Sequence, residues 1–352
     1  MPKPNRTIPP DDGDRIEGYP HPRETPLFIG QEAVLARAQR ALRGGRPPQG
    51  WLITGPPGIG KATLAYRIAR YLLAFGASDK GPEDLSVPAG DPNAILVAAG
   101  SHPGLLVLKR GISEKTGKPM TELPVDEVRK LGGFFGLTSE SGGWRIAIVD
   151  TADEMNVNAA NAILKLLEEP PRRAMLLLIA NRPGRLLPTI RSRCQRLDLR
   201  PLGEAIVTAA LEAYLPDAAG QERAALAQLS GGAIGRALAL AEGEGRELAA
   251  EADRLIESAD APDLNGLTQL GDRLWRVRDG LSRFGDLLTE RLSVRIRVRA
   301  RRGGAGLKAW TELLAGLDER FAQARELNLD PRQTLMSVAR AMASTARKAG
   351  PP

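Results

Sequence analysis

Residues 51–63 read WLITGPPGIGKAT, and this stretch decides the fold. From Gly55 to Lys61 it satisfies the phosphate-binding pattern G-x-x-x-x-G-K. An apolar run suited to a buried strand precedes the loop, and a helical pattern from Ala62 to Phe75 follows it. This order points a helix N-terminus, with its dipole, at a phosphate group. We therefore predict a phosphate-binding loop rather than an ordinary glycine turn.

The residue after the loop lysine is unusual. In a working loop, backbone N–H groups cradle the phosphates, the lysine reaches the β/γ oxygens, and a Ser or Thr hydroxyl holds Mg²⁺. Here Ala62 takes the place of that hydroxyl. Thr63 is an imperfect substitute, because one step along a helix rotates a side chain by about 100°. Backbone cradling does not need the hydroxyl, so ATP binding stays open while Mg-dependent hydrolysis is disfavoured. The nucleotide-binding candidates are Gly55, Pro56, Pro57, Gly58, Ile59, Gly60, Lys61, Ala62 and Thr63, with Asp150 and Asn181 further along.

Further apolar runs alternate with helical patterns. The run at 145–149 ends in Asp150, which places a carboxylate at the carboxyl edge of a parallel sheet, where such folds bind ligands. Another run, 175–180, is followed by Asn181. This alternation predicts an α/β domain with a parallel sheet. Beyond about residue 201 the pattern is mostly helical, although residues 294–298 alternate like a strand and their assignment stays open.

Composition narrows the class of protein. A chain of 352 residues predicts two or three domains. Its single cysteine and two histidines exclude an internal disulfide and a multi-cysteine zinc site, so no metal site is expected. No apolar run approaches the roughly 20 residues that span a bilayer, and the first residues lack the apolar core of a signal peptide. We expect a cytoplasmic protein without a membrane segment.

The net charge of +7 permits an acidic partner such as nucleic acid. Between Arg273 and Arg302 ten arginines face three acids, a local balance of 10 − 3 = +7. That segment predicts either a nucleic-acid track or a solvated helix face. The residues alone leave both readings open.

Two longer motifs carry a family resemblance. Residues 158–171 read NAANAILKLLEEPP, and residues 186–194 read LLPTIRSRC. Both are similar to the bacterial clamp-loader family of AAA+ proteins, and with the loop and Asp150 the resemblance covers most of residues 28–200. It implies a AAA+ P-loop domain with a parallel sheet, a small helical lid and a helical C-terminal collar that oligomerises. The expected domains are a flexible tail at 1–24, the P-loop domain at 25–200, the lid at 201–244 and the collar at 245–352.

The resemblance also implies roles for single residues. Arg193, in the family's S-R-C motif, would be an arginine finger that acts on a nucleotide held by a neighbouring subunit. Three positions depart from the family's ATP-hydrolysing members: Ala62 lacks the metal ligand, Thr151 replaces the glutamate that polarises water, and Gly235 occupies the sensor-arginine position. Cys194 is expected to be a small buried residue. The zinc module of many relatives is absent, since residues 76–104 contain no cysteine.

The implied function is that of a largely non-hydrolysing subunit of the DNA polymerase III clamp loader, active in DNA replication. Its partners would be gamma/tau-type motors, a delta-type clamp opener, the sliding clamp and primed DNA. The alternative is a hydrolysis-competent ATPase, either a clamp-loader motor or a branch-migration motor. Lys61, Asp150 and Asn181, which matches the first sensor position, support it, whereas Ala62 and Thr151 oppose it. A third reading, a DNA-binding protein recruited by its basic face, predicts steeply salt-dependent affinity.

Overall fold

The computed structural model describes residues 15–16, 18–43, 47–110, 120, 122–136, 143–276, 280–301, 303, 306–327 and 329–352. The chain divides into two compact units, Met1–Ala239 and Leu240–Pro352. The first unit contains both the P-loop segment and most of the segment expected to form a lid. Residues 1–14 and 17 of the expected tail lie outside the described residues.

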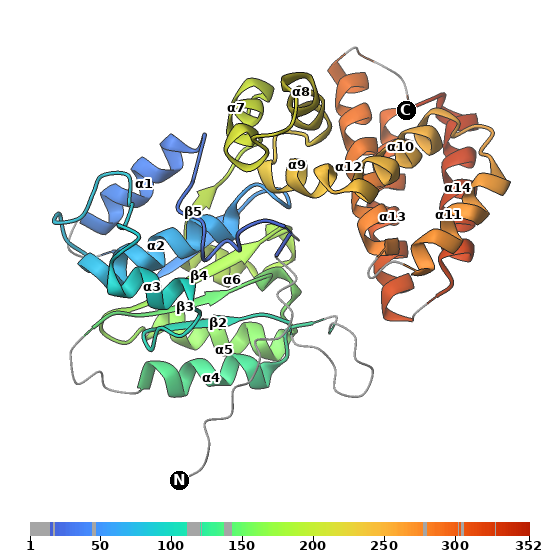
Figure 1. Cartoon of the computed structure of the whole chain (residues 1–352). Helices are drawn as coiled ribbons and strands as arrows, with labels where there is room; N and C mark the ends of the chain where they lie inside the picture. Colours follow the sequence, from blue (N-terminus) through green and yellow to red (C-terminus); the bar gives the residue numbers. More distant parts are fainter. Residues whose placement is uncertain are drawn as a thin grey trace, which may run out of the picture. The chain divides into compact units, whose positions relative to one another are not determined.

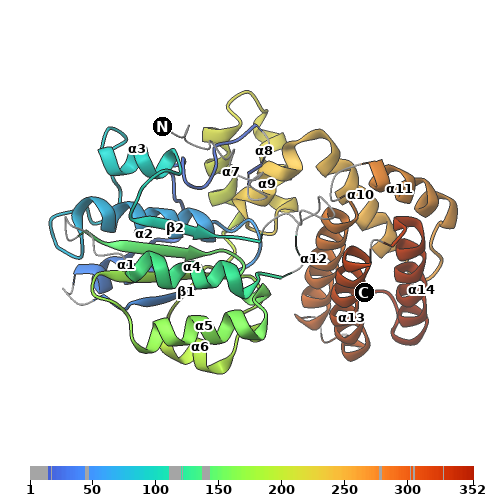
Figure 2. The same cartoon turned by 90° about the horizontal axis from the view of Figure 1, so that it is seen from below.

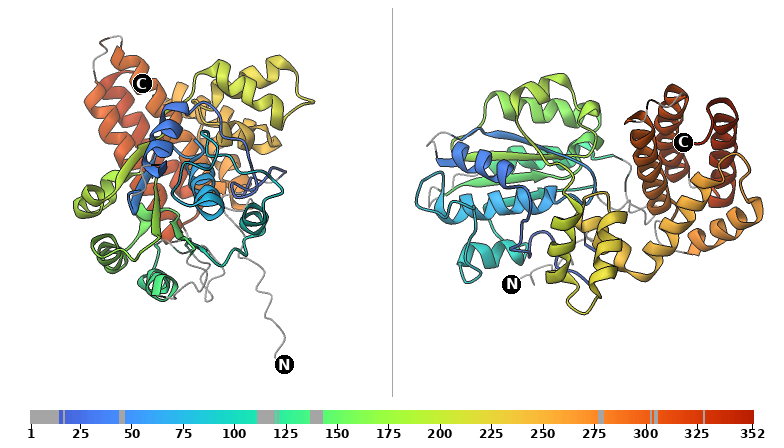
Figure 3. Two further views of the ribbon diagram at one scale, coloured as in Figure 1. Left: turned by 90° about the vertical axis from the view of Figure 1, so that its left-hand side faces the viewer. Right: turned by 90° about the horizontal axis from the view of Figure 1, so that it is seen from above.

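The first unit is built around a five-stranded parallel sheet with the strand order β2-β3-β4-β1-β5. Helices lie on both faces of this sheet (Figures 1 and 3). The arrangement confirms the predicted parallel α/β fold. The strands are β1 (Gly50–Thr54), β2 (Leu105–Leu108), β3 (Arg145–Val149), β4 (Ala174–Ala180) and β5 (Gln195–Asp198).

Strand periodicity divides the buried residues between two cores. In β4, Leu177 and Ile179 face a core shared with α2, whereas Leu176 and Leu178 face a second core shared with α5. Because successive side chains of a strand point to opposite faces, a strand that is apolar throughout must be covered on both sides. This explains why β4 reads as one continuous apolar run.

The helices of the first unit begin at recognisable signals. Asn156 caps α5 by accepting the Ala159 N–H at 2.9 Å, and Asp91 caps α3, which opens with Pro92. The helices are α1 (Glu32–Arg43), α2 (Lys61–Phe75), α3 (Pro92–Ala98), α4 (Val125–Gly136), α5 (Val157–Glu168), α6 (Pro188–Arg193), α7 (Glu204–Tyr214), α8 (Gly220–Leu229) and α9 (Ile234–Ala241), with short 3₁₀ turns η1 (Ala152–Glu154) and η2 (Pro183–Arg185).

The end of the expected tail is packed onto the first unit. Arg70 of α2 donates to the carbonyl of Arg23 at 2.8 Å and to that of Thr25 at 2.9 Å, and His21 is fully buried. Burial, with a contribution from nearby Arg67, lowers the pKa of Arg70 to about 10. The expectation of a flexible tail up to residue 24 is therefore wrong for residues 18–24. The sequence does not reveal this packing, because the contact with Arg70 is made by the backbone carbonyl of Arg23.

Within its described residues, the second unit is entirely helical. Figure 2 shows α12, α13 and α14 side by side. A core around Phe284, Trp310 and Met342 holds the helices together. Residues 294–298, with their strand-like alternation, lie inside α12, where the helical spacing of Leu288, Leu292 and Ile296 faces the core. The helices are α10 (Gly243–Glu257), α11 (Leu264–Arg276), α12 (Gly280–Arg301), α13 (Leu307–Glu326) and α14 (Pro331–Ala349).

Three arginines of the arginine-rich segment are paired with acids of α10. Arg291 of α12 binds both carboxylate oxygens of Asp253 in α10, with its Nε 2.7 Å from Oδ1. One turn further, Arg295 pairs with Glu257 at 2.7 Å, and Arg273 of α11 reaches Glu251 at 2.8 Å. These arginines join α10 to its neighbouring helices. The structure therefore favours a structural role for them over a continuous nucleic-acid track.

Candidate functional site

The glycine loop has the backbone that its glycines permit. Gly55, Gly58 and Gly60 all have positive φ angles, of 148°, 73° and 100°. Residues with a Cβ rarely adopt these conformations. Ile59 is buried, whereas Gly58 is exposed. The loop is thus anchored in the core at Ile59, while Gly58 lies at the surface.

Lys61 lies inside its own loop. Its side chain is buried, and Nζ donates to the carbonyl oxygens of Gly55 at 2.8 Å and Pro56 at 2.7 Å. A charged ammonium hydrogen-bonded to two carbonyls is well positioned at the first turn of α2. The loop therefore has the cation and the helix N-terminus that a phosphate requires.

The residue after the loop lysine, where a Mg²⁺ ligand is expected, is apolar. Ala62 packs against the core between α2 and the sheet, so its methyl group contributes to packing at the position of the missing hydroxyl. Among the described residues, no group of three or more His, Cys, Asp or Glu side chains could hold a metal ion. The loop fits a phosphate group, but it offers no oxygen for Mg²⁺ at residue 62.

Asp150 lies at the carboxyl end of β3, as the sequence predicts, and it is buried. Lys109, which follows the adjacent strand β2, places Nζ 3.8 Å from Asp150 Oδ2. The sequence analysis did not identify Lys109. Its position one residue beyond an apolar strand is the same signal that identified Asp150.

Thr151 has a left-handed backbone, with φ 56° and ψ 50°. This conformation costs a β-branched residue about 1–2 kcal/mol. The hydroxyl donates to the carbonyl of Asp150 at 2.7 Å. It is therefore engaged with the backbone at the position where the family's motors carry a general base.

The next two acids are also engaged. Asp153 accepts the N–H of Asn181 at 3.2 Å and that of Arg182 at 2.7 Å, which ties the end of β4 to η1. Glu154 pairs with Arg110 at 2.7 Å. Neither carboxylate is placed as a substitute for the missing glutamate. Asn181, at the predicted end of β4, is held through its backbone rather than by its own side chain.

The start of α9 lies directly on the glycine loop. The N–H of Gly235 donates to the carbonyl of Gly58 at 2.9 Å. A Cβ at residue 235 would be 3.0 Å from that oxygen, and a Cβ at residue 58 would be 2.8 Å from the N–H nitrogen of Arg236. Glycine at residue 58 is favoured by both its positive φ and this close approach, and glycine at residue 235 lets the start of α9 sit against the Gly58 carbonyl without strain.

Arg193 closes α6 at the surface. Its Nη2 is 2.8 Å from Glu168 Oε1, and Nη1 donates to the carbonyl of Thr189 at 3.2 Å. The side chain is 38% exposed. Cys194, the next residue, is buried, and burial raises the pKa of its thiol to about 12. This confirms the prediction that Cys194 is a small buried residue.

The same residues are matched by known proteins. The family described as DNA polymerase III, delta subunit matches residues 30–203. The DNA polymerase III subunit delta' of Pseudomonas aeruginosa is 42% identical over 183 residues, which are 52% of each chain, and that of Escherichia coli is 34% identical over 204 residues, 58% of each chain. The segment at residues 30–203 is therefore similar to the DNA polymerase III delta' subunits.

The match to the delta' family is partial in length. The chain spans little more than half the length of the two relatives. The region that the family model matches contains the glycine loop, Asp150, Asn181 and Arg193 but not Gly235. A DNA polymerase III subunit gamma/tau of Mycobacterium tuberculosis is also similar, at 31% identity over 175 residues, 49% of this chain and 28% of that protein.

Solved structures resemble the chain more distantly. The RuvB Holliday junction branch migration motor of Thermotoga maritima is 19% identical, with a TM-score of 0.43 over 66% of this chain and 68% of that one. A DNA polymerase III gamma subunit-related protein of the same organism is 19% identical, with a TM-score of 0.38 over 90% and 99% of the two chains.

Two contacts at the delta' family's motifs were missed in the sequence analysis: the Arg193–Glu168 ion pair and the seat of Gly235 on Gly58. The first joins the two motifs that carried the resemblance, so it could have been suspected from them. The second joins residues far apart in sequence, and no local signal predicts it.

In the part of the chain that the structure describes, no single helix is long and apolar enough to cross a membrane; only α8 and α9 together, bent by 118°, reach that length and composition.

Proposed function

We propose that the chain acts as the delta' subunit of a DNA polymerase III clamp loader. In this role it is a largely non-hydrolysing member of the assembly and takes part in loading a sliding clamp onto primed DNA. Its neighbours are gamma/tau-type motors and a delta-type clamp opener. The second unit supplies the collar contacts, and the first supplies Arg193 to a neighbour's ATP.

The observation that carries this proposal is the environment of Arg193. The guanidinium ends a short helix and is 38% exposed, and its carboxylate partner Glu168 is 50% exposed. Exposed ion pairs are worth about 0–1 kcal/mol, so a stronger anion can displace this one. The phosphoryl group of a neighbour's ATP is such an anion, and an arginine finger can contribute about 10³–10⁵ in rate.

The chain's own site supports binding over turnover. Lys61 and the glycine loop can cradle a phosphate, which would allow ATP to bind without rapid hydrolysis. Ala62 offers no metal ligand, and the Thr151 hydroxyl is bonded to a backbone carbonyl. A hydroxyl is also a poor general base near neutral pH.

The test is nucleotide binding and hydrolysis by the purified chain, with and without Mg²⁺, alone and mixed with gamma/tau-type motor subunits. We expect negligible turnover alone and stimulation of the motor's ATPase when mixed. The Arg193→Ala variant should fold and bind the motor but fail to stimulate it. Robust turnover by the isolated chain, unchanged by Thr151→Ala, would establish the alternative of an active ATPase.

A further inference from the structure

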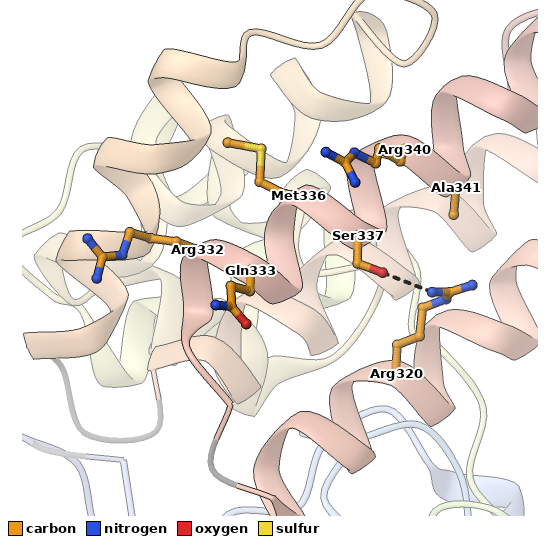
Figure 4. A pocket seen from close by; sticks show the side chains of 7 residues that line it. All are labelled: Arg320, Arg332, Gln333, Met336, Ser337, Arg340 and Ala341. Carbon is orange, nitrogen blue, oxygen red and sulfur yellow. Dashed lines mark hydrogen bonds between the residues drawn. The ribbon is translucent and has the colours of Figure 1, made fainter.

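A groove of about 630 Å³ runs along α14 in the second unit. Three arginines, Arg320, Arg332 and Arg340, surround Met336, Ser337 and Ala341 (Figure 4). Arg320 comes from α13, and the other residues come from α14. The groove is separate from the glycine loop and from Arg193.

One face of α14 lines this groove. Its residues at 333, 336, 337, 340 and 341 recur with the spacing of a single helical stripe. The opposite stripe, including Leu335, Val338 and Met342, is fully buried in the core of the unit. The groove side of α14 is therefore left available after the helix has satisfied its own packing.

The groove is positively charged, and part of that charge is available. Arg340 forms no ion pair with any described residue. Arg320 donates one 2.9 Å hydrogen bond to the Ser337 hydroxyl, and its other N–H groups can bind a further acceptor. Arg332 is held by Asp272 at 3.3 Å and Asp330 at 3.0 Å. Residues 331–349 contain three arginines and one lysine but no acid.

An exposed tryptophan adjoins the groove. Trp275 of α11 is 61% exposed and borders a smaller hollow of about 210 Å³ that shares Arg332 with the groove. Tryptophan and arginine dominate the binding energy of protein interfaces, usually around a small apolar centre. Trp275, Met336 and the three arginines form such a combination on one unit.

We propose that this groove binds an acidic segment of a partner protein, with carboxylates on Arg320 and Arg340 and an apolar side chain on Met336 or Trp275. The surface favours a protein segment over nucleic acid because Met336 and the exposed Trp275 supply an apolar centre beside the arginines, as in protein interfaces.

The test uses the full-length chain and a fluorescein-labelled oligoglutamate peptide that carries one tryptophan. Fluorescence anisotropy gives its affinity for the wild type, Arg320→Gln, Arg340→Gln and the double variant. Each exposed charge pair lost should weaken binding by about twofold to fivefold. The matched control is Arg297→Gln, which removes the same charge from an exposed site on α12 outside the groove and should leave the affinity unchanged.

Three results would overturn the proposal. The first is no peptide binding at low ionic strength. The second is an equal loss in Arg297→Gln, which means that net charge alone attracts the peptide. The third is an oligothymidylate that binds more tightly than the peptide and is weakened by the same groove variants, which assigns the groove to nucleic acid. None of the substituted side chains is buried, so we expect all variants to fold. Thermal melts of each variant check this expectation.

Discussion

Arg193 and Glu168 form an ion pair of 2.8 Å that joins the end of α6 to the end of α5. Each residue belongs to one of the two sequence motifs that carry the resemblance. The pair holds the guanidinium at the surface, and under the proposed function it has to open before Arg193 can reach a phosphate on another chain.

The Glu168→Gln variant should release Arg193 without unfolding the chain. The stability change should stay within about 1 kcal/mol, because the pair is exposed. In a mixture with motor subunits, stimulation of ATP hydrolysis should rise by about twofold to fivefold, since opening the pair no longer opposes the reach of Arg193. Urea unfolding and steady-state ATPase assays measure the two effects. A drop in stimulation equal to that of Arg193→Ala would instead show that the ion pair itself is the active arrangement.

A methyl group at residue 235 should disturb the seat of α9 on the glycine loop. Overpacking typically costs about 1–3 kcal/mol, and the added Cβ would be 3.0 Å from the Gly58 carbonyl. Gly220→Ala is the matched control, because residue 220 also lies in a helix of the same unit and a Cβ there has no neighbour within 4 Å. The control should gain up to about 1 kcal/mol from helix propensity. Equal gains for both variants in urea unfolding would contradict the predicted contact.

His102 should make the first unit sensitive to mild acid. Its Nδ1 accepts the N–H of Gly104 at 2.9 Å, so that nitrogen carries no proton, and burial lowers the pKa of the ring below its ordinary value of 6.5. The unfolded chain therefore binds the proton more tightly, and stability is present above pH 6.5 and falls as the pH decreases through the folded-state pKa.

The comparison for His102 is the His102→Asn variant, which keeps a side-chain acceptor but does not titrate. The free energy of unfolding of the wild type should decline more steeply than that of the variant between about pH 7 and pH 5. Parallel curves would show that another group is responsible for the acid sensitivity.

The Arg291–Asp253 pair should be structural. Arg291 is 12% exposed and binds Asp253 through two nitrogens, so Arg291→Ala leaves a partly buried carboxylate unpaired. We expect a loss of about 1–3 kcal/mol in the second unit. The affinity of the full chain for an oligothymidylate should be unchanged within twofold at moderate salt. A tenfold fall in that affinity without loss of stability would restore the nucleic-acid interpretation of α12.

Much of the first unit could be predicted because its signals are local. The apolar runs before Gly55, Asp150 and Asn181 each identify a buried strand, and the residue after each run marks the edge of the sheet. The strand β5 was missed because Leu197 is its single apolar residue, which gives no apolar run; β5 is the edge strand of the sheet and pairs with β1. Asp198 at the end of that strand accepts a hydrogen bond from the Thr54 hydroxyl. The sequence alone does not show that these two residues are neighbours.

The partners of the site residues could not be predicted, since they depend on contacts between distant segments. Lys109 and Asp150 meet because β2 and β3 are neighbours in the sheet. The order of the strands in the sheet cannot be inferred from the sequence of either strand. The helical assignment of residues 294–298 was likewise decided by packing, because their alternation is also compatible with a helix whose one stripe is buried. Local patterns therefore located the site, and only the fold assembled it.

The contact between Gly58 and Gly235 also couples substitutions at two distant positions. A Cβ at residue 58 would meet the backbone of α9, and a Cβ at residue 235 would press on the Gly58 carbonyl. A larger side chain at either position is therefore expected to shift the start of α9 relative to the glycine loop. Tolerance of a substitution at one glycine should depend on the residue at the other.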